Sequence, residues 1–272
     1  MGILNYLQFD DVKSSDFGVY ISGEALFDAP KRSVEIVSIP GRNGNLVLDL
    51  KRFENIEVSY PAFNFEKDLQ DFRQKLAGLR SGLCSKIGYQ RLVDTFHPDE
   101  FRQGVYKEGL EVKPIMYNEG ANFTIKFDCK PQRFLVSGEI PQIFTVNGSI
   151  VNPTLFASSP LIKVTGNGQV AIGDYIFTVK GNSSTITIDT EIMDSYIPAG
   201  ETYLLTDENG NVITNEIGIE IEIVNGNVYP RNMNSYIEFR DGIIPKIEPG
   251  EQKIRKSENI SALEIIPRWW RL

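Results

Sequence analysis

Ile39-Pro40-Gly41-Arg42-Asn43-Gly44-Asn45-Leu46 is the stretch of this chain that most constrains its fold. It contains Pro-Gly and Asn-Gly, two turn sequences, because proline presets φ while asparagine and glycine tolerate positive φ. Residues 33–39 and 45–50 on either side alternate or run apolar and are rich in β-branched side chains. The pattern predicts a β-hairpin closed by a two-residue Asn43-Gly44 turn, with Arg42 projecting from its tip.

The hairpin is followed by a strand and then by one helix. Residues 56–63 have strand character, and the helix is predicted over residues 66–81. Asn64 is a plausible N-cap, and Gly82 can end the helix. The helix has an apolar stripe at helical spacing, made by Leu69, Phe72, Leu76 and Leu79.

Further strands are expected after the helix. Residues 103–107 are predicted to pair with part of residues 111–117 in a hairpin, and residues 121–130 alternate as another strand. Residues 137–141, with a Ser-Gly and an Ile-Pro pair, mark the expected domain boundary.

The second half has β character almost throughout. Its clearest strands are residues 175–180, 185–189 and 217–224, and Asn-Gly turn sequences stand at residues 147–148, 209–210 and 225–226. The expected fold is therefore an α+β domain over residues 1–138, with sandwich-like strands, one helix and a protruding hairpin, followed by an all-β sandwich over residues 139–272.

Composition and charge exclude several classes of function. With 41% hydrophobic and 24% charged residues, the 272-residue chain is ordinary for a globular protein. No apolar run is long enough to cross a bilayer, so membrane insertion is not expected. The net charge is −8, and most of the acidic excess follows residue 138. This distribution argues against nucleic-acid binding, which needs clustered positive charge.

Taken in order, several segments resemble the distal tail proteins (Dit family) of phages with long non-contractile tails. The hairpin and its flanking strands resemble the family's N-terminal domain. The other segments that match, in the correct order, are residues 88–102, 129–134, 152–168, 244–251 and 263–270.

The resemblance implies a structural role and no catalysis. Family members form a ring, expected to be a hexamer, at the distal tip of the virion tail. Their expected partners are the tail-tube protein, a tail hub or tail-associated lysin-type protein, the tape-measure protein in the channel, and receptor-binding or baseplate proteins. The second domain would be galectin-like. Residues 195–222 look longer than in a minimal member, which indicates an added hairpin.

The hairpin tip is the candidate inter-subunit contact on this resemblance. It comprises Pro40, Gly41, Arg42, Asn43 and Gly44. From the residues alone, a solvated turn arginine is the favoured interpretation of Arg42, and only the resemblance favours a contact with a neighbouring subunit.

The residues that usually carry chemistry are sparse. His97 is the single histidine and stands before Pro98-Asp99, which is typical of a turn. Cys84 and Cys129 lack metal-ligand spacing and are expected to be two buried thiols, although a disulfide is possible. Asp189-Thr190-Glu191 places two carboxylates on one strand face, a pair expected to face solvent. The chain is therefore predicted to be no enzyme and to hold no metal or cofactor.

An alternative function is a carbohydrate-binding module that recognises the bacterial surface. Trp269 and Trp270 are adjacent, so on a strand they face opposite ways, and one could stack on a sugar. The competing interpretation is that they anchor the last strand.

Overall fold

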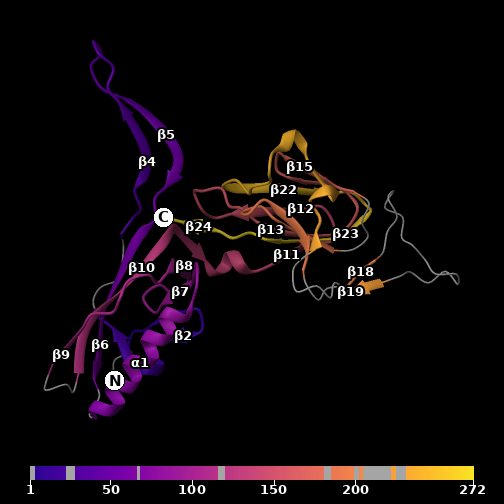
Figure 1. Cartoon of the computed structure of the whole chain (residues 1–272). Coiled ribbons are helices and arrows are strands. Elements are labelled where there is room, and N and C mark those ends of the chain that lie inside the picture. The colour runs from indigo at the N-terminus through magenta and orange to yellow at the C-terminus, as the bar shows by residue number, and fades with distance from the viewer. Residues whose placement is uncertain are drawn as a thin grey trace. The chain divides into compact units, whose positions relative to one another are not determined.

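The computed structural model describes residues 4–22, 28–65, 68–115, 120–180, 185–198, 202–204, 222–224 and 231–272. The chain divides into two compact units (Figure 1). The first unit comprises residues 1–134 and Leu272, and the second comprises residues 135–271.

One sheet forms the framework of the first unit. Its strands lie in the order β2-β1-β7-β8-β10-β6-β3, and β9 also pairs with β10. The expected sandwich-like strands therefore belong to a single sheet. The strands are β1 (Leu7–Phe9), β2 (Val12–Lys13), β3 (Val19–Ile21), β6 (Ile56–Phe65), β7 (Gln90–Asp94), β8 (Glu100–Val105), β9 (Val112–Ile115) and β10 (Gly120–Leu135), with the 3-10 helix η1 (Ser14–Phe17) between β2 and β3.

The predicted helix is present, but it is displaced toward the C-terminus. α1 spans Leu69–Ser85, and the Asp68 side chain caps it by accepting hydrogen bonds from the Gln70 and Asp71 amides. The prediction of Asn64 as the cap was wrong, because Asn64 lies in β6 and its buried amide donates to the Phe17 and Gly18 carbonyls.

The prediction that Gly82 ends the helix was also wrong. It lies inside α1, where a Cβ would stand 3.0 Å from a Val12 methyl group. The absence of a side chain lets β2 approach the helix closely. The glycine therefore serves packing rather than helix termination.

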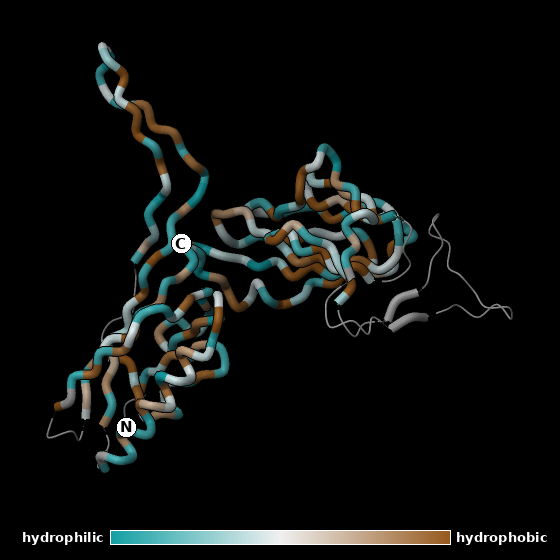
Figure 2. The backbone as a smooth tube through the Cα atoms, viewed as in Figure 1, coloured by the Kyte–Doolittle hydropathy of each residue, from teal (hydrophilic) through white to brown (hydrophobic). Residues whose placement is uncertain are grey.

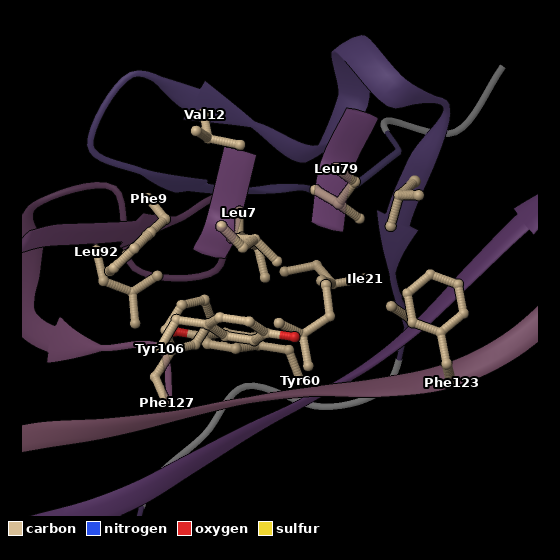
Figure 3. Packing of buried hydrophobic residues seen from close by; sticks show 14 of the residues in the cluster. Leu7, Phe9, Val12, Ile21, Tyr60, Leu79, Leu92, Tyr106, Phe123 and Phe127 are labelled. Carbon is tan, nitrogen blue, oxygen red and sulfur yellow. The ribbon is translucent and has the colours of Figure 1, made fainter. Parts of the chain in front are cut away.

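The core of the first unit lies between α1 and the sheet (Figure 3). Phe127 is its aromatic centre, with ring centroids 5.0 Å from Phe9 and 5.7 Å from Tyr106. Tyr60 also contacts this ring, and its buried hydroxyl donates to Asp94 at 2.9 Å. The helix contributes Phe72, Leu76, Leu79 and Leu83, all buried. Burial of one such large apolar side chain contributes about 1.5–3 kcal/mol.

The hairpin predicted between residues 103–107 and 111–117 was wrong. β9 pairs with β10, in a register that places Val112 opposite Phe123. β8 pairs with β7, where Gln90 lies opposite Gly104. The strand predicted over residues 121–130 is confirmed, and as β10 it extends to Leu135.

The second unit consists mainly of two antiparallel sheets around one core. The six-stranded sheet has the order β11 (Gln142–Phe144), β23 (Ile260–Ile266), β13 (Leu161–Gly166), β16 (Thr185–Asp189), β17 (Asp194–Ile197), β20 (Arg231–Asn232). The five-stranded sheet has the order β12 (Gly148–Asn152), β22 (Gly250–Lys256), β14 (Gly168–Ile172), β15 (Tyr175–Val179), β21 (Ile237–Phe239). The predicted sandwich and the strands at 175–180 and 185–189 are confirmed.

A third, small sheet lies where the added hairpin was predicted. β18 (Thr202–Leu204) and β19 (Glu222–Val224) are antiparallel, with Thr202 opposite Val224. The Asn-Gly sequences at 209–210 and 225–226, and most of the predicted strand 217–224, lie outside the described residues. The unit also contains the short 3-10 helices η3 (Val136–Glu139), η4 (Asn234–Tyr236) and η5 (Arg240–Gly242), and β24 (Trp270–Arg271) near its C-terminus.

A backbone clasp joins the two ends of the second unit. The Arg268 amide donates to the Gly138 carbonyl at 2.8 Å, and the Leu135 amide donates to the Trp269 carbonyl at 2.8 Å. Residues 138 and 269 lie so close together that a Cβ on Gly138 would stand 2.3 Å from the Trp269 nitrogen. Only glycine fits there without displacing the backbone.

We expect Gly138→Ala to destabilise the second unit by about 1–3 kcal/mol, because the new methyl group has no space. Thermal unfolding of the purified full chain measures the effect. Gly109→Ala is the matched control, since nothing lies within 4 Å of its Cβ position. Equal melting temperatures for the two variants would refute the steric role of Gly138.

Candidate functional site

The most distinctive surface of the first unit is a hairpin that stands apart from its main sheet. β4 (Arg32–Val37) and β5 (Leu46–Phe53) form a separate two-stranded sheet, with Ile36 opposite Val47. Figure 1 shows the pair projecting from the rest of the unit. We call residues 32–53 the arm. Its presence confirms the protruding hairpin expected from the sequence.

The arm is apolar on both faces. Because neighbouring residues on a strand point in opposite directions, Ile36 and Val47 share one face while Leu46 and Leu48 share the other. Ile36 is 61% exposed and Val47 58% exposed. The alternating apolar segments are visible along the arm in Figure 2. The exposed apolar residues of the arm are Val34, Ile36, Leu46, Val47, Leu48 and Leu50.

Such a surface is unusual for an unpartnered element. A two-stranded hairpin has no core of its own and is at best marginally stable in water. A contiguous exposed apolar patch is typical of a surface that binds another protein. The arm is therefore the part of the described chain best suited to protein–protein contact.

Polar contacts fix the base of the arm. Arg32 Nε donates to Asp49 Oδ1 at 3.1 Å, and a second hydrogen bond joins the same two side chains. Asp49 Oδ1 also accepts from the Lys51 amide, where the strand register shifts and the Lys51 φ is 56°. Chiefly the hydrogen bonding from Arg32 lowers the pKa of Asp49 to about 2. The ion pair and the bulge both lie at the base of the arm, and a bulge increases the local twist of a strand pair.

The tip of the arm differs from the predicted two-residue turn. The last paired residues are Val37 and Leu46, so the connection is a longer loop, residues 38–45. Gly41 and Gly44 have φ of 81° and 80°, whereas Asn43 has no positive φ. The Arg42 amide donates to the Ile39 carbonyl at 3.2 Å. All five candidate contact residues, Pro40 to Gly44, are exposed.

The two tryptophans occupy different environments in the second unit. Trp269 is 3% exposed and belongs to the core. The partly buried Trp270 ring stacks on Phe156, with centroids 4.5 Å apart and planes 19° apart. Its indole N–H donates to the Ala157 carbonyl at 3.0 Å. Both rings therefore make anchoring contacts within the protein.

Asp189 is buried in an ion pair whereas Glu191 is exposed, so the two carboxylates do not face solvent together. Arg268 donates to both oxygens of Asp189, at 2.7 and 2.8 Å, and lies 3.6 Å from Glu191. Burial alone would raise the pKa of Asp189, but the hydrogen bonds and charge of Arg268 lower it below its ordinary value. The ion pair with Arg268 therefore gives Asp189 a structural role.

The remaining reactive side chains are those of one histidine and two cysteines. His97 lies in the predicted turn, with Nδ1 3.0 Å from Asp94. Both cysteines are free; Cys129 is buried as predicted, whereas Cys84 is exposed. In the part of the chain that the structure describes, no group of three or more His, Cys, Asp or Glu residues could hold a metal. No described helix is long and apolar enough to span a membrane.

The sequence predicts the hairpin tip, but the exposed apolar faces of the arm behind it were not predicted. The signal was present in residues 46–50, Leu-Val-Leu-Asp-Leu, where apolar residues occupy both faces of a strand. Such a run usually indicates a strand buried on both sides. Only the structure shows that nothing in the described chain covers it.

Comparison with solved structures reveals the fold. The chain superposes on the Dit protein of phage SPP1, described as a paradigm of the hub adsorption apparatus of phages that infect Gram-positive bacteria, with a TM-score of 0.68 and 12% identity, covering 99% of this chain and 100% of that one. It therefore has the fold of SPP1 Dit.

Chains of the activated phage P2 baseplate are also similar. The calcium form has a TM-score of 0.48 and 10% identity, covering 97% of each chain. The strontium form has a TM-score of 0.48 and 11% identity, covering 100% of this chain and 99% of that one. No family model and no curated protein sequence matches the chain.

We expect Asp189→Asn to lower the stability of the second unit at pH 7 by about 1–2 kcal/mol, because the ion pair with Arg268 is lost. Since the pKa of Asp189 is depressed in the folded state, the wild-type contribution is complete above pH ~4 and disappears as the pH falls through the folded pKa. Urea unfolding between pH 7 and pH 2 should therefore show a smaller acid-dependent loss in the variant. Asp174→Asn, at an exposed site, is the control; identical pH profiles for Asp189→Asn and wild type would contradict the assignment.

Proposed function

We propose that this chain is a structural protein of the phage tail tip. It forms a ring, with six copies expected, at the distal end of a long non-contractile tail and joins the tail tube to the hub and host-adsorption apparatus. The fold shared with SPP1 Dit over the whole chain supports this role. The observation that carries it is the arm, whose apolar faces need a partner.

A ring requires two different complementary surfaces on every copy, so that each subunit contacts the next head to tail. The arm can supply one of these surfaces. A neighbouring copy that covers Ile36 and Val47 removes their apolar area from water, which favours assembly. The tip, residues 40–44, would reach furthest onto that neighbour.

The other partners follow from the same proposal. One ring face would bind the tail-tube protein and the other a tail hub or lysin-type protein, with receptor-binding or baseplate proteins attached around them. The channel would admit the tape-measure protein. Residues 1–138 would build the ring, and the galectin-like domain 139–272 would point outward. No catalysis and no specific nucleic-acid binding belong to this role; the net charge of −8 agrees with the latter.

The second candidate function is recognition of a bacterial surface carbohydrate by the second unit. The tryptophans offer it little support, because Trp269 is buried and the Trp270 ring is stacked on Phe156. Their contacts favour the anchoring interpretation.

The solution mass of the full chain tests the ring. Light scattering after size exclusion, with negative-stain images of the same fraction, should give a mass near six protomers and a closed ring. A chain that remains monomeric at the highest attainable concentration would contradict self-assembly.

We expect the double variant Ile36→Lys with Val47→Glu to abolish self-association. These residues lie opposite each other, so the new charges can pair across the strands and preserve the hairpin while removing two apolar side chains from one of its faces. The loss of two buried aliphatic side chains corresponds to at least about 3 kcal/mol, or roughly a hundredfold weaker association between copies. Sedimentation at several concentrations measures the change.

The matched control is Val151→Lys in the second unit. Val151 is 58% exposed and lies opposite Glu251, so its replacement also adds a cross-strand ion pair. It should leave both assembly and melting temperature unchanged. Equal association of the arm variant and this control would remove the arm from the interface.

We expect Arg42→Ala to weaken ring assembly by about two- to fivefold without unfolding the protomer, because an exposed charge at an interface contributes at most about 1 kcal/mol. The melting temperature should not change, since among the described residues Arg42 makes only a backbone contact. Arg255→Ala, another exposed arginine, is the control. An unchanged oligomer at low protein concentration would exclude the tip as a contact.

A further inference from the structure

A small cavity lies among buried polar side chains of the first unit. Its volume is about 10 Å³, which suits one water molecule or one monatomic ion. Strands β7, β8 and β10 and the turn between β7 and β8 supply its lining. Arg102 lies opposite the core residue Leu92, so its side chain stands on the core side of the sheet. The polar lining residues are Asp94, His97, Glu100, Arg102 and Arg133.

Arg102 is the residue of this cavity whose hydrogen bonding is incomplete. It is 6% exposed, and its Nη1 has no hydrogen-bond partner among the described residues. A guanidinium cannot escape the cost of burial by losing its proton, so it needs a partner that compensates its charge. Because Arg102 lines the cavity, a ligand held there can supply the missing acceptor.

The two carboxylates that line the cavity are engaged by other groups. Asp94 accepts hydrogen bonds from the Tyr60 hydroxyl at 2.9 Å and from the His97 amide at 3.0 Å, and His97 Nδ1 also lies 3.0 Å from it. Glu100 Oε2 lies 3.5 Å from Arg133 Nη1. Within the described ranges, neither carboxylate accepts a hydrogen bond from the unpartnered Nη1.

The local charge favours an anion over a water molecule. Arg133 is a second guanidinium beside the same cavity. Burial and then the charge of Arg133 lower the pKa of Arg102, and the attraction of Glu100 opposes this less strongly. A water molecule can accept one hydrogen bond, but it does not reduce the repulsion between two guanidinium groups. An anion does both.

The size of the cavity restricts the kind of anion. Phosphate, sulfate and a carboxylate side chain each have several heavy atoms, which do not fit a space of about 10 Å³. Chloride is a common anion that consists of a single atom, and it accepts hydrogen bonds from N–H groups in any direction. The volume and the charge therefore point to the same ligand.

We propose that this cavity binds one chloride ion, with Arg102 Nη1 as its hydrogen-bond donor and Arg133 as a second positive charge. The ion completes the buried polar cluster and thereby stabilises the first unit. No residue of the arm lines the cavity. Chloride binding and ring formation through the arm can therefore fail independently.

Urea unfolding of the full chain at increasing chloride concentration tests the proposal. Sodium gluconate keeps the ionic strength constant, because gluconate is too large for the cavity. A ligand that binds only the folded state stabilises it by mass action. Above the dissociation constant, each tenfold rise in chloride should therefore raise the folding equilibrium constant about tenfold.

Arg102→Met removes the buried charge and keeps an apolar side chain in its place. The variant should lose the chloride dependence. In gluconate alone it should be at least as stable as wild type, because the folded state no longer buries an uncompensated charge. Arg73→Met, at an exposed position of α1, is the matched control and should keep the chloride dependence of wild type.

A crystal of the wild-type chain grown in sodium bromide gives a readout that does not depend on the folding of any variant. Bromide replaces chloride and scatters X-rays anomalously. One anomalous peak is expected within hydrogen-bond distance of Arg102 Nη1.

Two results would overturn the proposal. One is a wild-type stability that does not respond to chloride at constant ionic strength, together with no anomalous peak in the cavity; a water molecule then fills it. The other is a chloride dependence that Arg102→Met retains, since the ion would then bind elsewhere.

Discussion

The organisation of the first unit depends on one constraint: a two-stranded ribbon cannot bury both of its faces against itself. In the arm, Ile36 and Val47 lie on one face and Leu46 and Leu48 on the other, so coverage of one face still leaves the second open. A strand in the middle of a sandwich would meet this requirement within its own chain. No described part of the chain covers the arm, and this exposure is why we propose a role in assembly rather than a ligand pocket.

The remainder of the first unit can tolerate such an arm because its own core is complete. α1 and the main sheet enclose Phe127, Phe9 and Tyr106, and the polar end of Tyr60 is satisfied by Asp94. The arm contributes no residue to this buried cluster. Its apolar surface is therefore free to change through evolution or mutation with little effect on the protomer. The Arg32–Asp49 ion pair and the bulge at Lys51 fix its base instead.

In the second unit, the two tryptophans and the ion pair between Arg268 and Asp189 anchor the C-terminal residues. Trp269 enters the core, the Trp270 ring stacks on Phe156, and Arg268 clamps Asp189 with two hydrogen bonds. Together with the Gly138 contact, these interactions hold residues 268–270 against Gly138, Phe156 and Asp189 of the same unit. Residues that could suggest sugar stacking or paired-carboxylate catalysis are thus explained by anchoring.

The sequence by itself determined the elements whose signals are local. The period of Phe72, Leu76 and Leu79 predicts α1, and alternating residues predict β15 and β16, because burial of one face imposes a fixed spacing. The tertiary structure decided what depends on distant partners. Val12 explains why Gly82 lies inside the helix, and β10 rather than β8 pairs with β9. The exposure of the arm was likewise undetermined, because whether a side chain is covered depends on residues far away in the chain, which no local pattern specifies.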